Sequence, residues 1–429
     1  MEIYSSVVDK LKEVGVDKIQ YKVESSVFDP IPKGVLVFDS DLPTDCHNFF
    51  IGTGVPFYFK KTNATNSTMI KLPSFSVVET SCGGSAGIAK FHSRIELAAT
   101  SMISGNYNIK NSYQAKNGKE VIEDILSSSN QLKGLETDIT ATDNPANLNR
   151  SLGQPEVSFI MNEVLDAYLI GGEKPVFYLG LDNKLYFTSL RKLNQNKENN
   201  VAILQIGSEQ GDLAKSFIAS KKNDFNSGGK NKFKNLNFNT QNATFSIKVG
   251  ANGSFRDLGG VYYFTDYSSP LMLNLKGKHI APVNPDGARL PVVTTFFSND
   301  YAGGCIQNRP NMNIDIELST MLNYSASKLI EVVVEGVSID YEEPIDDSPI
   351  LQAGFNILLV LPYLYSVYNG VYTVTKVEHL MEDKGCSSRL TMHRMCVEEE
   401  WAELIKVHKA HASFPYEKAV AATTGFLHK

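Results

Sequence analysis

The sequence predicts a β-rich α+β protein in which two antiparallel β regions flank a mixed helix and hairpin segment, and a helix closes the chain. Three observations lead to this prediction. Alternating patterns typical of strands dominate the beginning and the last third, helical periodicity is confined to short segments, and no repeated βαβ alternation is visible. With 429 residues, the chain has room for about two to four domains.

Composition narrows the class of protein. Hydrophobic residues make up 42% and charged residues 21%, as in globular proteins, which excludes a disordered or fibrous chain. The longest apolar run, 355–364, contains Asn356 and Pro362 and is only half as long as the roughly 20 residues that a membrane-spanning helix needs. A net charge of −6 argues against a dedicated nucleic-acid-binding protein.

The 5 cysteines are too scattered for a disulfide framework, and their odd number indicates reduced thiols and cytoplasmic synthesis. Because none belongs to a C-x-x-C pair, we expect no structural zinc site. The segment 1–15 lacks the uninterrupted apolar core of a signal peptide.

The first third predicts one helix and several strands. Residues 4–14 have the apolar spacing of a short amphipathic helix, which ends at Gly15. Strand-like runs bounded by turn residues follow at 21–23, 35–38, 56–59 and 75–78.

The middle of the chain changes character. It predicts helices at 119–127 and 157–170, strands at 175–178 and 184–188, and a polar loop at 221–240. The glycine pair 171–172 stops the second helix, and the two strands form a hairpin that turns at 182–183.

The last third is strongly β. It predicts strands at 244–249, 312–318, 329–339, 355–361, 370–378 and 389–392. Most of these runs alternate as antiparallel strands with one solvated face do, whereas 355–361 is apolar on both faces and is interpreted as a buried central strand. A helix at 397–411 follows, with acids in its first turn.

The segment 83–87 reads GGSAG, which matches the nucleophile elbow of serine hydrolases. A strand precedes it, and 88–102 has a helical pattern. A hydrolase using Ser85 would also need an acid and a histidine such as His379 or His393, within a parallel sheet that the sequence does not predict. We interpret the segment as a glycine-rich loop and keep the serine hydrolase as an alternative.

Other candidate groups give weaker signals. Cys82 and His92 could form a thiol and base pair, but we interpret Cys82 as a buried small hydrophobic residue. His408 and His411 lie one helical turn apart without a third ligand nearby, so we predict no metal site. No phosphate-binding glycine loop with its lysine occurs, and we expect no cofactor.

The segment 361–395 resembles the closing element of tailed-phage baseplate hub proteins. The positions that carry the resemblance are Gly370, Tyr372, Val374, Val377, His379, Gly385, Leu390 and Arg394. The preceding run, 351–359, resembles the glycine-led strand of the same family, with Ala-Gly-Phe at 353–355 in place of the usual Pro-Gly-Asp.

A second stretch, 117–188, resembles the part of these proteins that follows the first barrel. GKEVIEDIL at 118–126 is similar to the family's helix, and NRSL, VSFI and PVFY, beginning at 149, 157 and 175, are similar to its helix-then-hairpin insertion. The same plan occurs in the N-terminal half of type VI secretion spike proteins.

This resemblance implies a fold of two tail-tube-like antiparallel β-barrels with a mixed helix and hairpin insertion and a C-terminal helix. The expected domains are a first barrel at 1–105, the insertion at 106–240, the second barrel at 241–396, and a C-terminal helix and tail at 397–429. Strands of the insertion segment could return to the first barrel.

The resemblance also implies a non-enzymatic structural protein, without cofactor or metal, at the centre of a phage baseplate or related contractile injection system. It would form a homotrimer that joins the hexameric tail tube to the trimeric spike around an axial DNA channel. Expected partners are the tail tube, central spike, tape measure and baseplate wedge proteins, with no membrane. Its location would be the virion tail baseplate, after assembly in the host cytoplasm. A hexameric tail-tube ring protein is a further alternative.

Two functional regions follow as hypotheses. The segment 397–429 would be an arm that grips a neighbouring protein through Trp401, Leu404 and Ile405, or a helix that packs on its own barrel. Acidic strand residues would suit a channel that repels DNA, although they could simply face solvent; these are Asp315, Glu317, Glu331 and Glu335.

Overall fold

The computed structural model describes residues 2–40, 54–84, 90–103, 111–207, 236–249, 260–266, 274–279, 292–298, 330–341, 350–382 and 385–394, apart from short gaps at 14, 17, 56–57, 63–66, 144, 172–173, 363–364 and 366–367. The strand predicted at 312–318 and the helix predicted at 397–411 lie outside these residues.

Helix α1, Ser6–Glu13, confirms the helix predicted at 4–14. Gly15 follows with a φ of 87°, a left-handed conformation that glycine adopts without steric cost and that commonly ends helices. The apolar face of the helix is buried; it consists of Val7, Val8 and Leu11. These three side chains join the main core, so α1 covers part of the buried face of the sheet described next.

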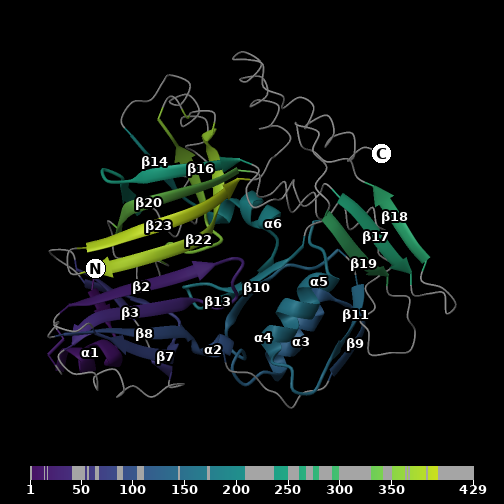
Figure 1. Ribbon diagram of the computed structural model, residues 1–429, viewed down its shortest axis with the longest axis horizontal. Helices are drawn as coiled ribbons and strands as arrows, with labels where there is room; N and C mark the ends of the chain where they lie inside the picture. The colour runs from purple at the N-terminus through teal and green to yellow at the C-terminus, as the bar shows by residue number, and fades with distance from the viewer. Residues whose placement is uncertain are drawn as a thin grey trace.

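Twelve strands form one sheet, which we call the long sheet (Figure 1). Along its main path the strands are β15 (Leu236–Asn239), β20 (Ile330–Tyr341), β23 (Gly385–Arg394), β22 (Gly370–Glu382), β2 (Ile19–Ser26), β3 (Lys33–Ser40), β8 (Phe91–Ala99), β7 (Phe75–Gly83) and β4 (Gly54–Val55). Three more strands join it: β16 (Thr244–Val249) pairs with β20, β21 (Asn356–Val360) pairs with β22, and β14 (Asn200–Gln205) pairs with β21.

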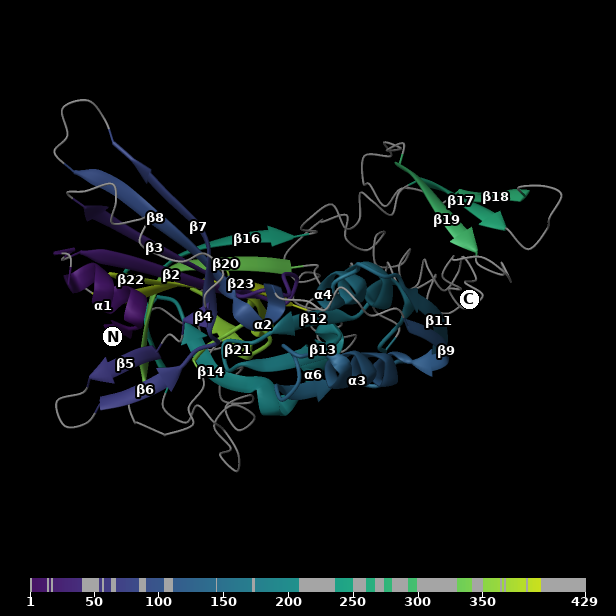
Figure 2. The ribbon, with the colours of Figure 1, turned by 90° about the horizontal axis from the view of Figure 1, so that it is seen from below.

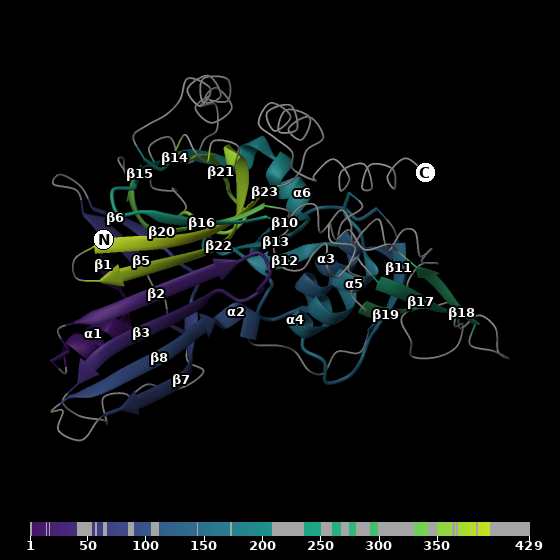
Figure 3. The same ribbon diagram turned by 45° about the horizontal axis from the view of Figure 1, so that its top comes forward.

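Strands from the first and last thirds of the chain pair in the middle of this sheet. Strand β2 pairs antiparallel with β22, from Tyr21 opposite Met381 to Ser26 opposite Lys376. In Figure 3 the purple N-terminal strands and the yellow-green C-terminal strands therefore run side by side. Every residue of β21 is buried, which confirms the central strand predicted at 355–361.

One apolar core lies under both halves of the long sheet. Its fully buried members include Tyr21, Val23, Leu36, Ile95, Val332, Val334, Leu359, Tyr372, Val374, Val377, Leu390 and Met392. The structure confirms the β-rich α+β class. It differs from the two closed barrels implied by the resemblance, because the main strand path of the described residues is open, ending at β15 and β4.

Among the described residues, two three-stranded sheets belong neither to the long sheet nor to the mixed α/β segment described next (Figure 2). The first consists of β1 (Glu2–Tyr4), β5 (Tyr58–Thr62) and β6 (Ser67–Lys71). The second consists of β17 (Gly260–Asp266), β18 (Asn274–His279) and β19 (Val292–Ser298).

A mixed α/β segment with its own core follows β8. Its elements are α2 (Thr100–Ile103), β9 (Asn111–Asn117), α3 (Gly118–Ser128), β10 (Glu136–Ile139), β11 (Pro145–Arg150), α4 (Glu156–Phe159), a π-helical turn (Ile160–Val164), α5 (Leu165–Ala167), β12 (Val176–Leu179), β13 (Lys184–Thr188), α6 (Leu190–Gln195) and a 3₁₀ turn (Lys197–Asn199). We call it the insertion; the domain boundaries expected from the sequence stay a prediction.

Local sequence signals explain the start of the insertion. Asn117 caps α3 by accepting the N–H of Lys119, while the Glu120 carboxylate accepts the N–H of Asn117, which together form a capping box. The predicted hairpin is present as β12 and β13, and Asn183 at its turn has a φ of 61°.

A fully buried ion pair lies between β11 and α4. The Arg150 guanidinium donates from Nε and Nη2 to the carbonyl oxygen of Gln154, at 3.0 and 2.8 Å. Its Nη2 also lies 3.5 Å from Oε1 of Glu156, and the two side chains are 0% and 1% exposed. The pair therefore holds the turn before α4 from inside the insertion.

Two predicted elements are wrong. The helical pattern at 88–102 corresponds instead to strand β8 followed by the short helix α2. Pairing with β3 on one side and β7 on the other favours the extended form of this segment over its helical propensity. The loop predicted at 221–240 ends in strand β15, which pairs with β20.

Two glycines lie at positions that neighbouring side chains approach closely. They belong to the segments 351–359 and 361–395, which carry the family resemblance. A Cβ at Gly370 would lie 2.5 Å from the guanidinium carbon of Arg394, whose Nη1 donates to the carbonyl oxygen of Asn369 at 2.7 Å. A Cβ at Gly354, which has a φ of 94°, would lie 2.1 Å from the hydroxyl oxygen of Tyr178 in β12. Gly354 thus lets the insertion dock closely on the long sheet.

Candidate functional site

The long sheet presents one face to its core and the opposite face outward. Along each strand, alternate residues point to opposite faces, so charged side chains gather on the outward one. We call the outward side chains of β16, β20, β23, β22, β2, β3 and β8 the polar face. The Lys and Arg residues among the described side chains of this face are Lys22, Lys33, Arg94, Lys248, Lys376 and Arg389.

Four charged residues form an ion-pair ring where β2 meets β22. Glu24 lies directly opposite Glu378, and the repulsion between these two like charges is offset by two lysines. Lys22 lies 3.4 Å from Glu24 and 3.0 Å from Glu378, whereas Lys376 lies 3.4 Å from Glu24 and 2.7 Å from Glu378. Each charge of the ring therefore has two partners of opposite sign.

The contacts within the ring shift the pKa values of Glu378 and Lys376. Burial disfavours the ionised form of Glu378, but hydrogen bonds from Lys376 and Lys22 outweigh it and lower the pKa of that carboxyl. Burial likewise opposes the charge of Lys376, while its bonds to Glu378 and Glu24 raise the pKa of the ammonium group overall. Both shifts favour the ionised forms of Glu378 and Lys376.

The remaining cations of the polar face are also paired. Nη2 of Arg94 lies 2.8 Å from Glu96, and Nε of Arg389 lies 3.0 Å from Glu335. Lys33 pairs with Asp29, which lies four residues before it in the connection between β2 and β3. Each of these three cations thus has a carboxylate partner.

Glu331 is the centre of a further cluster on β20. Its carboxylate lies 2.9 Å from Nζ of Lys248 and 3.3 Å from Nε2 of His393, whose Nδ1 lies 2.7 Å from Oγ1 of Thr375. Hydrogen bonding to His393, opposed by burial and assisted by Lys248, lowers the pKa of Glu331 to about 2. This predicted channel acid is 6% exposed and belongs to an ion-pair cluster.

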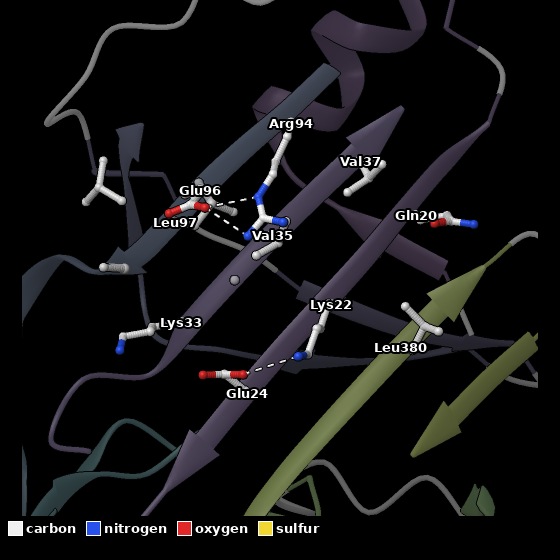
Figure 4. A pocket seen from close by; sticks show the side chains of 13 residues that line it. Gln20, Lys22, Glu24, Lys33, Val35, Val37, Arg94, Glu96, Leu97 and Leu380 are labelled. Atoms are coloured by element: carbon white, nitrogen blue, oxygen red, sulfur yellow. Dashed lines mark hydrogen bonds and ion pairs between the residues drawn. The ribbon is translucent and has the colours of Figure 1, made fainter. Parts of the chain in front are cut away.

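A groove of about 400 Å³ crosses the polar face over β2, β3 and β8 (Figure 4). Its floor is formed in part by Val35 and Val37, and charged side chains stand around it, including Lys22, Arg94 and Glu96. The lining mixes short apolar and fully paired charged groups, which offers no convergent set of polar atoms for a small ligand.

The strands that flank Ser85 do not form the strand-to-helix connection of a serine hydrolase. Ser85 lies outside the described residues, but the strands on either side of its loop, β7 and β8, pair antiparallel with each other. A nucleophile elbow connects a strand to a helix. Cys82 is exposed, so its interpretation as a buried residue is wrong.

His379 is a structural residue of the core. Its Nδ1 lies 2.8 Å from Oγ of Ser388 and its Nε2 lies 2.7 Å from the carbonyl oxygen of Leu351. Nε2 therefore donates to the carbonyl, and Nδ1 accepts from the serine. Burial, only partly offset by the bond to Leu351, lowers the pKa of His379 to about 4.

This pKa predicts a pH dependence of stability. Unfolded, His379 takes up a proton near pH 6.5, but folded it does so only near pH 4, so acidification favours the unfolded state. From about pH 7.5 to 5, the wild type should lose about 2 kcal/mol of unfolding free energy more than His379→Gln. Urea unfolding of both proteins at both pH values measures this difference, and equal losses would contradict it.

Other predicted functional residues fall outside the described part of the chain. These are Trp401, Leu404, Ile405, Asp315, Glu317, His408 and His411. Within the described residues, no group of three metal-binding side chains occurs, and none of the helices is long and apolar enough to cross a membrane. The ion-pair ring was missed because its strands are about 350 residues apart in sequence, and only their register brings it together.

The chain shares its fold with a tail protein of known structure. The tail protein from Neisseria meningitidis MC58 matches with a TM-score of 0.50 at 11% sequence identity, covering 87% of this chain and 91% of that chain. This likeness confirms, at the level of fold, the resemblance that the motifs predicted. No protein-family model matches the sequence, and no curated protein matches it.

Two further solved structures match with lower scores. The 43 kDa tail protein of prophage MuSo2 from Shewanella oneidensis has a TM-score of 0.48 at 8% identity, covering 88% of this chain and 98% of that chain. A type VI secretion system component from E. coli has a TM-score of 0.44 at 10% identity, covering 93% of this chain and 78% of that chain.

Proposed function

We propose that this protein is the central hub of a phage-type tail baseplate. In this proposal it joins a hexameric tail tube to a trimeric spike around an axial DNA channel, as a structural protein without catalytic activity. The observation that carries the proposal is the fold shared with the tail protein from Neisseria meningitidis over 87% of this chain.

The architecture of the long sheet supports a threefold-to-sixfold adaptor. Strands from the N-terminal and C-terminal thirds of the chain lie on either side of the β2–β22 pair and share one core. Three copies of such a two-part sheet supply six sets of strands, the number that a sixfold ring requires. The proposed assembly is therefore a homotrimer.

The polar face is the surface that we assign to the channel. It is continuous across both halves of the sheet, and its charges are satisfied within the chain. The opposite face is buried in the core and is not available to a channel. Tail tube, spike, tape measure and wedge proteins are the proposed partners, and the virion baseplate is the proposed location, with assembly in the host cytoplasm.

Light scattering of the purified protein at several concentrations tests the proposal. The hub alone should have three times the chain mass of 47.4 kDa, or should form a complex with the spike protein that contains three copies of the chain. A hexamer would instead favour the tail-tube ring protein. A chain that stays monomeric with both tube and spike proteins would contradict the hub.

The C-terminal arm is a separate part of the proposal. Trp401, Leu404 and Ile405 supply its apolar contacts to a neighbouring baseplate protein. Deleting 397–429 should then abolish binding to the spike or wedge while leaving the trimer intact. Unchanged binding to both proteins would rule out the arm.

A further inference from the structure

The six Lys and Arg residues of the polar face share one property: each has a carboxylate within ion-pair distance. The partners come from the same strand, from the neighbouring strand or from an adjacent turn; they are Glu24, Asp29, Glu96, Glu331, Glu335 and Glu378. Each cation of the face is therefore paired locally, by a carboxylate of the same chain.

Local balance has a consequence for contact with DNA. A free lysine or arginine beside a duplex binds a backbone phosphate and releases a counterion, and several such contacts hold the DNA in place. A cation already bonded to a carboxylate must give up that bond before it contacts phosphate. Nζ of Lys376, for example, lies 2.7 Å from one carboxylate and 3.4 Å from another.

We infer that the carboxylates of the polar face act as built-in competitors of DNA phosphate, so that a duplex passes along the face without being held. This inference rests on the proposed channel. It differs from the acidic lumen expected from the sequence, because Glu331 and Glu335 are each paired with a cation. A balanced face neither attracts the duplex strongly nor repels it.

The sharpest test frees two cations without disturbing buried groups. Glu96→Gln combined with Glu335→Gln releases Arg94 and Arg389, whose side chains are 50% and 51% exposed. Both substitutions keep the shape of the side chain. A second variant, Glu24→Gln with Glu378→Gln, opens the ion-pair ring and releases Lys22 and Lys376.

The control makes the same change of charge elsewhere. Glu136 and Glu198 lie on β10 and on the 3₁₀ turn of the insertion, away from the polar face, and both side chains are exposed. Glu136→Gln combined with Glu198→Gln therefore raises the net charge by the same amount. Any general effect of charge on DNA binding appears equally in this control.

Fluorescence anisotropy with a labelled duplex of about 25 base pairs, at about 50 and 200 mM salt, gives the readout. We expect the Glu96/Glu335 variant to bind the duplex at least tenfold more tightly than wild type and control at low salt, and to lose this gain at high salt. Equal binding by wild type and variant, or an equal gain in the control, would overturn the inference.

The DNA-binding measurement can be interpreted separately from the test of the proposed hub. Light scattering on the same samples reports whether wild type and variants form the same oligomer. A variant that gains DNA binding while the protein fails to assemble with tube and spike would support the balanced face and contradict the hub. A trimer whose variants gain no DNA affinity would support the hub and contradict the balanced face.

Discussion

Replacing Gly354 by alanine should destabilise the protein by about 3 kcal/mol or more, enough to remove much of the stability of an ordinary domain. Two costs add at this position. The backbone φ of 94° is strained for any residue with a Cβ, and the new Cβ would lie 2.1 Å from the hydroxyl oxygen of Tyr178. The N–H of Gly354 also donates to the carbonyl oxygen of Val374 at 2.7 Å, so the backbone has little room to shift.

Two further variants separate these costs. Gly153 has a φ of 86° with nothing near the position of its Cβ, so Gly153→Ala should show the conformational cost alone, about 1 kcal/mol. Adding Tyr178→Phe to Gly354→Ala removes the clashing oxygen and should recover part of the loss. Chemical unfolding measures wild type, the three variants named above and Tyr178→Phe alone. Independent, additive effects at Gly354 and Tyr178 would show that the two residues do not clash.

Breaking the buried Arg150–Glu156 pair should cost about 3 to 5 kcal/mol, because one charge remains in the core of the insertion. Glu156→Gln leaves the guanidinium, which stays charged in proteins, in the core without its carboxylate partner. Arg150→Met leaves the carboxylate there instead and also removes the two bonds to Gln154.

Replacing both partners gives the decisive comparison. Arg150→Met with Glu156→Leu removes both charges while retaining apolar volume, so it should be more stable than either single variant. It still loses the two bonds from Arg150 to Gln154, which leaves it below wild type. Glu123→Ala, which breaks an exposed pair with Lys119, should change stability by less than about 1 kcal/mol. A double variant no better than Glu156→Gln would contradict the buried-charge explanation.

Elements with strong local signals could be predicted from the sequence. Helix α1 ends at a glycine, α3 begins with a capping box, and the β12–β13 hairpin turns at Asp182 and Asn183, so a few neighbouring residues suffice for each. The segment 88–102 was mistaken for a helix because its alanines and spaced apolar residues suit a helix. Pairing with β3 and β7 stabilises the extended conformation of this segment instead.

The candidate site depends on information that no local pattern contains. Glu24 and Glu378 each have ordinary strand surroundings in sequence, and nothing near either residue indicates the other. Their pairing follows from the register of β2 against β22, which the shared core and the bulge in β22 fix together. The motif at 361–395 indicated a family, and the structure explains its residues as packing: Gly370 accommodates Arg394, and His379 bonds inside the core.

The β2–β22 pair also sets the timing of folding on the ribosome. Tyr21 pairs with Met381, so the first central strand waits for its partner while nearly the whole chain is made, about 20 to 70 seconds at ordinary rates of synthesis. During that interval the growing chain holds unmatched apolar strands, whereas the insertion, with its separate core, is already complete. We therefore expect the insertion to fold first. The long sheet is completed last, after β22 and β23 have been synthesised.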